Sequence, residues 1–136
     1  MDHRHLSRRL GHALDNATGL MWVRNPSGDL GAPFNATINW ANALAACEAV
    51  SFYGHTDWRL PNVKELLSIV DYETTVRYLD TAVFTNCQGG FYWTGTTHKG
   101  DTSKAWRVST LDASSSAAAK TVTVLMFARP VRGGAP

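Results

Sequence analysis

One short segment gathers side chains that could do chemistry: a base, a hydroxyl, a carboxylate, an indole and a cation stand in the run His55-Thr56-Asp57-Trp58-Arg59. Such groups can serve general acid–base catalysis when a substrate lies within their reach. A Trp with an Asp–Arg pair just before a helix more often anchors a long loop, because the ring packs inside and the ions fix the corner. We therefore predict a structural role for this segment.

The rest of the chain offers little for nucleophilic or metal chemistry. No G-x-S-x-G motif is present, and the clustered serines have no His and Asp nearby in sequence. His3 and His5 do not form a helical H-x-x-x-H pair, no C-x-x-C occurs, and the acidic residues lack EF-hand spacing. We predict no catalytic residue, no metal site, no cofactor and no enzymatic activity.

The two cysteines, Cys47 and Cys87, permit one disulfide without requiring it. Two free thiols are at least as compatible with a domain that has an ample hydrophobic core. The cysteines therefore do not indicate whether the protein resides in an oxidising or a reducing compartment.

The composition describes one globular domain. The chain has 136 residues, of which 44% are hydrophobic and 18% charged, with a formal net charge of +2. That charge is too small to indicate nucleic acid as a partner. Basic residues crowd the first dozen positions without the apolar run of a signal peptide, and no stretch approaches the ~20 apolar residues of a membrane span. We expect a soluble chain with a basic leader at 1–8 and a domain at 9–134, without membrane insertion.

Two helices are predicted from apolar spacing and capping residues. Asn39 can cap a helix whose stripe has i, i+3, i+4 and i+7 spacing and includes Cys47, which should therefore point into the core. Asn62 and Glu65 have capping-box spacing at the start of a second helix after Pro61.

Sequence patterns typical of β-strands dominate the second part of the chain. Strands are expected at 20–23, 91–94, 105–110 and 121–127, because these segments are apolar, aromatic or β-branched. The segments 98–103 and 112–119 are expected to be turns or loops. Early helices followed by a late antiparallel meander indicate the α+β class.

Several blocks of the sequence resemble one known family. They are Asp15-Asn16-Ala17-Thr18-Gly19-Leu20-Met21-Trp22, Gly54-His55-Thr56-Asp57-Trp58-Arg59-Leu60-Pro61-Asn62, Tyr92-Trp93-Thr94-Gly95-Thr96, Ala105-Trp106-Arg107-Val108 and Arg129-Pro130-Val131-Arg132-Gly133. In order and spacing, from about residue 9 to 134, the chain is similar to the Lcl C-terminal domain family. The resemblance implies a C-type-lectin-like fold, in which two helices flank a twisted antiparallel sheet and the N- and C-terminal strands lie close together.

The same resemblance implies a ligand-binding module. Members include adhesin domains that bind sulfated polysaccharides, and others resemble the variable proteins of diversity-generating retroelements, whose C-terminal third is rewritten at adenine-derived codons. Here the segment 109–127 departs from the Asn, Tyr, Gly and acidic residues usual in the family. Codon rewriting and ordinary drift both account for that departure.

The binding surface is expected in the last third of the chain, for a protein ligand. The candidate residues are Gly95, Thr97, His98, Lys99, Arg107, Ser109, Leu111, Ser114, Ser115, Val122, Val124 and Leu125. Mixed apolar and hydroxyl side chains suit a protein better than a sugar, with an exposed Val124 or Leu125 as the apolar anchor. The alternative is an adhesin-type module whose cations bind the sulfates of a polysaccharide. Those cations are Arg24, Lys99, Lys104, Arg107, Arg129 and Arg132.

Three further expectations follow from the resemblance. The family's frequent cysteine beside the closing arginines is replaced by Pro130, so any disulfide of Cys47 would be with Cys87. Formylglycine-generating enzymes share the broad fold, but their active-site cysteine pair does not match the placement of these two. An oligomer, and display on a virion or cell surface through a larger assembly, are compatible with a binding module.

Overall fold

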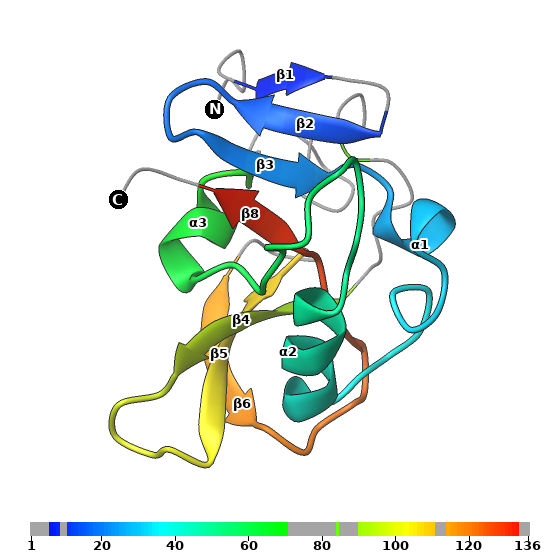
Figure 1. The fold of residues 1–136 in the computed structure, drawn as a ribbon. Helices are drawn as coiled ribbons and strands as arrows, with labels where there is room; N and C mark the ends of the chain where they lie inside the picture. The colour runs from blue at the N-terminus through cyan, green and yellow to red at the C-terminus, as the bar shows by residue number, and fades with distance from the viewer. Residues whose placement is uncertain (1–5, 9–10, 71–83, 85–89, 111–113, 134–136) are drawn as a thin grey trace.

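The computed structural model describes residues 6–8, 11–70, 84, 90–110 and 114–133, with the backbone alone for 6–8 (Figure 1). These residues form two four-stranded sheets and three short helices, an α+β architecture as predicted. The first sheet has the order β1-β2-β3-β8, with bounds Leu6–Arg8, His12–Asp15, Leu20–Val23 and Val131–Gly133. The second has the order β6-β5-β4-β7, with bounds Ser115–Ala119, Lys104–Ser109, Phe91–Thr97 and Met126–Phe127. The helices are α1 (Pro26–Asp29), α2 (Trp40–Glu48) and α3 (Val63–Leu67).

The first sheet joins the two ends of the described chain. Strand β8 pairs antiparallel with β3, with Val131 opposite Trp22 (Figure 1). This places the C-terminal strand β8 in one sheet with the three N-terminal strands, next to β3 and at the opposite edge from β1. Strand β1 pairs antiparallel with β2, so Leu6–Arg8 extends the sheet, whereas the sequence placed the start of the domain at residue 9.

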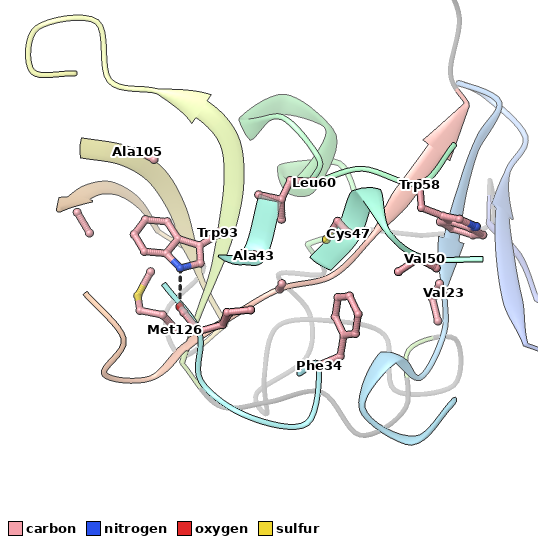
Figure 2. Close-up of a cluster of buried hydrophobic side chains, with 13 residues drawn as sticks. Val23, Phe34, Ala43, Cys47, Val50, Trp58, Leu60, Trp93, Ala105 and Met126 are labelled. Carbon is pink, nitrogen blue, oxygen red and sulfur yellow. Dashed lines mark hydrogen bonds between the residues drawn. The ribbon is translucent and has the colours of Figure 1, made fainter. Parts of the chain in front are cut away.

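Strand β4 of the second sheet is buried on both faces. Neighbouring residues of β4 point to opposite sides, and both Tyr92 and Trp93 are buried. Tyr92 belongs to a cluster that includes Leu66 of α3, while Trp93 belongs to a second cluster that includes Cys47 of α2. Figure 2 shows the second cluster, with the hydrogen bond of 2.9 Å that the Trp93 indole donates to the Ile38 carbonyl. The helices therefore cover the sheet from two sides.

The two predicted helices form where their caps predict. The Asn39 side chain accepts a hydrogen bond from the Asn42 N–H and begins α2. Cys47 is fully buried on this helix as a free thiol, and burial raises the pKa of that thiol. Asn62 and Glu65 make the predicted capping box at the start of α3.

A third helix, α1, is not among the two that the sequence predicts. Pro26 stands at the start of α1, and the Asn25 side chain accepts from the Gly28 N–H, so turn chemistry closes a single helical turn.

The prediction for the segment after β5 was wrong. Ser115–Ala119, expected to be loop, is strand β6, whereas within 121–127 only Met126–Phe127 is a strand. Serine and alanine have weak strand preference, but here they pair along β5, with Ala117 opposite Trp106. Tertiary pairing thus overrides local preference on both sides of Lys120.

Candidate ligand-binding surface

Among the described residues of the last third, the large apolar residues that are exposed lie in the turn between β6 and β7. In this turn, residues 121–125, Val124 is 76% exposed and Leu125 is 45% exposed. The Phe91 N–H donates to the Leu125 carbonyl at 2.8 Å, and Leu125 has a φ of +56°. A Cβ at Gly90 would lie 2.5 Å from that carbonyl, so glycine permits the close approach. Backbone bonds therefore hold two apolar side chains in solvent.

A half-buried arginine lies beside this turn. The Arg107 guanidinium carbon lies 3.6 Å from the centre of the Phe91 ring, its Nε donates to the Ser116 hydroxyl at 3.1 Å, and its Nη1 lies 3.5 Å from the Met126 sulfur. We call these four residues the Arg107 cluster. Burial lowers the pKa of Arg107, but arginine stays charged at neutral pH. The cluster presents one positioned cation on an aromatic surface.

The loop between β4 and β5 is ordered by its own side chains. The His98 Nδ1 accepts hydrogen bonds from the N–H groups of Gly100 and Asp101, at 3.2 and 3.0 Å. The His98 ring also lies 5.4 Å from the Trp106 ring. Lys99 is exposed next to this ring pair. Because the Lys120 N–H donates to the Ser103 carbonyl at 2.9 Å, turn 121–125 begins beside this loop.

The segment of residues 55–59 is a structural anchor, as predicted. Trp58 is 2% exposed, and its indole N–H donates to the carbonyls of Phe52 and His55 at 3.3 and 3.1 Å. The ion pairs differ from the expected Asp–Arg pair: Arg59 binds Glu65 through two bonds, and Asp57 binds Arg132. The pKa of Asp57 is lowered chiefly by the hydrogen bond from Arg132.

Comparison with protein families decides the identity of the domain. The model of the Lcl C-terminal domain matches residues 11–132. The chain belongs to the Lcl C-terminal domain family. In a direct comparison with curated proteins, no match is found.

The anchor explains part of what this Lcl C-terminal domain shares with its family. Arg59 and Val131 exchange backbone hydrogen bonds of 2.9 Å, and an Arg59 Nη2 donates to the Gly133 carbonyl at 3.1 Å. Two of the blocks that resemble the family, residues 54–62 and 129–133, therefore contact each other. Their contacts join α3 to strand β8.

The structure brings most of the predicted surface residues to neighbouring places. Lys99 and Gly95 are exposed and Thr97 and His98 half-buried along the end of β4 and its loop. The other group contains Arg107 with the turn 121–125, including a half-buried Val122. Ser114 and Ser115 are exposed at the start of β6. Leu111 lies outside the described residues.

The prediction that Ser109 is a surface residue was wrong. Its side chain is only 2% exposed, since it lies at the end of β5 opposite Phe91 and its N–H donates to the Ser114 carbonyl. Two contributors to the surface, Phe91 and Ser116, were not predicted. They lie beside Arg107 only through strand register, for which the sequence carries no local signal.

The cations proposed for a polysaccharide do not form one face of this Lcl C-terminal domain. Arg129 is 1% exposed, with its guanidinium carbon 5.1 Å from the Phe84 ring centre, so its predicted contact with a sulfate was wrong. Arg132 is paired with Asp57. Lys99 and Lys104 are exposed at the β4–β5 loop, and Lys104 lies 3.9 Å from Asp101.

Among the described helices, none has the length and apolar character needed to cross a bilayer.

Proposed function

We propose that this chain is a non-catalytic ligand-binding module with a C-type-lectin-like fold. Its ligand is a protein, bound by turn 121–125 together with the Arg107 cluster. The observation that carries this proposal is the exposure of Val124 and Leu125, at 76% and 45%, in a turn whose Leu125 carbonyl is bonded to Phe91, the residue on whose ring Arg107 lies. The pairing of β3 with β8 supports the fold assignment, because it brings the ends of the domain together.

The chemistry of this surface favours a protein over a sugar. Protein interfaces obtain most of their binding energy from a few aromatic, apolar and arginine side chains near their centre. Arg107 already lies on the Phe91 ring and binds Ser116, so little side-chain freedom remains for binding to remove. A sugar site would need exposed aromatic rings and carboxamides, which turn 121–125 lacks.

The buried core residues and the exposed residues of turn 121–125 are different positions, so one set can vary without the other. Such a division suits a variable protein of a diversity-generating retroelement. Met126 is fully buried, whereas Val124, two positions away, is largely exposed. Substitutions at the exposed positions should change binding with little effect on folding, because surface changes usually alter the free energy of unfolding by less than about 0.5 kcal/mol.

The proposal is tested by displaying a library randomised at the exposed residues Thr121, Thr123, Val124 and Leu125 and selecting it against lysozyme as a probe protein. Most clones should keep a thermal midpoint within a few degrees of the parent, and selection should yield binders. A matched library at the buried Met126 and its buried neighbours should mostly fail to fold. Loss of folding in most surface clones would contradict the proposal.

A second experiment addresses the polysaccharide alternative, which the exposed Lys99 and Lys104 favour. The domain should pass through a heparin column at physiological salt. Retention that is lost in a Lys99→Ala, Lys104→Ala variant and weakened by salt would favour a sulfated polysaccharide instead.

Genomic sequence tests the retroelement origin. A near-copy of the 3′ coding stretch, differing at adenines and lying beside a reverse transcriptase gene, is the expected finding. A surrounding locus without such a copy would contradict it.

A further inference from the structure

A second surface of the domain combines aromatic rings with a carboxylate. Gly11, Asp29, Phe52 and Tyr53 line a pocket of about 290 Å³. These residues come from the start of β2, the end of α1 and the segment between α2 and α3 (Figure 1). The pocket shares no residue with the surface proposed above.

A strained hairpin presents the main aromatic wall. Phe52 and His55 exchange two backbone hydrogen bonds of 3.0 Å around Tyr53 and Gly54, which have φ values of +53° and +75°. Two positive φ angles are the signature of a type I′ turn, in which Asn-Gly is the preferred pair. A tyrosine at the first position has an unfavourable left-handed backbone conformation. The turn therefore exposes the Tyr53 ring at a cost in backbone strain. The Trp58 indole donates to both carbonyls of the hairpin and holds it in place.

The rings around the pocket are fixed by one another. The Tyr53 ring centre lies 4.9 Å from that of Phe52 and 4.5 Å from that of His12, both edge to face. Tyr53 is nevertheless 45% exposed. A Cβ at Gly11 would lie 2.5 Å from the Tyr53 ring, so only glycine leaves the ring its present place.

The charged side chain among the residues that line the pocket is a carboxylate. Asp29 is exposed at the end of α1, and no ion-pair partner for it occurs among the described residues. The faces of aromatic rings attract cations, and a nearby carboxylate adds to that attraction. We propose that this pocket binds a small alkylammonium ion, such as the trimethylammonium group of a free organic cation. Tyr53 and Phe52 would contact the alkyl groups, and Asp29 would balance the charge.

The probe pair for this site is choline and 3,3-dimethylbutan-1-ol, which has the same shape without the charge. Binding is followed by calorimetry and by NMR shifts of the backbone amides of Gly11 and Gly54, at pH 8, where free histidine is neutral. Choline should bind with a dissociation constant on the order of 1 mM, since only a few cation–aromatic contacts contribute. The neutral analogue should bind at least about five-fold more weakly. Equal binding of the two compounds would overturn the proposal.

Variants separate the contributions of charge, ring and space. Asp29→Asn and Tyr53→Leu should each weaken choline binding about five-fold, whereas Tyr53→Phe should keep it. Gly11→Ala should weaken it as well, because the added methyl displaces the Tyr53 ring while every charge is retained. Glu48→Gln, which removes an exposed carboxylate elsewhere, is the matched control.

Thermal melting of each variant distinguishes loss of the site from loss of the fold. An Asp29→Asn or Tyr53→Leu protein that folds normally and binds choline as well as the parent would refute the proposal.

Discussion

Glu65 both caps α3 and forms an ion pair with Arg59. Its replacement measures the contribution of both interactions to the free energy of unfolding. Its Oε1 accepts from Arg59 Nη1 at 2.7 Å and from the Asn62 N–H at 2.8 Å, and its Oε2 accepts from Arg59 Nη2 at 2.8 Å. The side chains of Glu65 and Arg59 are 15% and 39% exposed. One carboxylate therefore completes the cap of α3 and fixes the arginine that bridges to β8.

The expected cost follows from these contacts. Glu65→Gln keeps an acceptor for the Asn62 N–H but loses the charge, which should lower the free energy of unfolding by about 1–2 kcal/mol. Glu65→Ala also removes half of the capping box, for a total of about 2–3 kcal/mol. In a domain of this size each kcal/mol should lower the thermal midpoint by about 3–5 °C.

The pH dependence has a definite sign. Burial by itself would raise the pKa of Glu65, but hydrogen bonds from Arg59 and the Asn62 N–H outweigh it, so the pKa is lowered. A carboxyl group with a lowered pKa in the folded state stabilises the fold above its unfolded pKa of about 4.3. That stability is lost as the pH falls through the folded value. The difference between parent and Glu65→Gln should therefore be full at pH 7 and shrink below pH 4.

Urea denaturation followed by tryptophan fluorescence at pH 7 and pH 3 provides the measurement. Glu48→Gln is the control, because Glu48 is exposed at the end of α2. It should change the free energy of unfolding by less than about 0.5 kcal/mol. A double-mutant cycle of Arg59→Met with Glu65→Gln should show coupling above about 1 kcal/mol. Additive effects would refute the reasoning.

Three further predictions concern the core and a tight turn. Arg129→Met should change the free energy of unfolding by less than about 1 kcal/mol, measured in urea, because the buried guanidinium finds no hydrogen-bond partner for Nε and Nη2 among the described residues; a loss above 3 kcal/mol would contradict this. In a Cys87→Ser background, Cys47 should react with a thiol reagent only as urea unfolds the protein, since burial raises its thiol pKa; rapid native labelling would contradict it. Gly133→Ala should lower the thermal midpoint by several degrees, because φ is +79° and a Cβ would lie 2.9 Å from the Gly19 carbonyl; an unchanged midpoint would contradict it.

Local signals were enough to predict helices α2 and α3 and the anchor. Asn39 and Asn62 cap their helices because a capping side chain bonds to an amide only a few residues away. Trp58 is buried just before α3 because its large aromatic ring gains free energy when its apolar surface is removed from water. These interactions span few residues, so the sequence alone determined them.

Long-range pairing decided the rest. Ser115–Ala119 became a strand and 121–125 a turn because β5 offered an edge to the first segment, a choice that local preference does not contain. Likewise Asp57 and Arg59, two residues apart, bind partners that are distant or on the next helix, and Ser109 is buried by register. The amino-acid types determined which polar groups needed hydrogen-bond or ion-pair partners and which apolar groups needed burial. Only the tertiary structure determined which residues provided those partners and that burial.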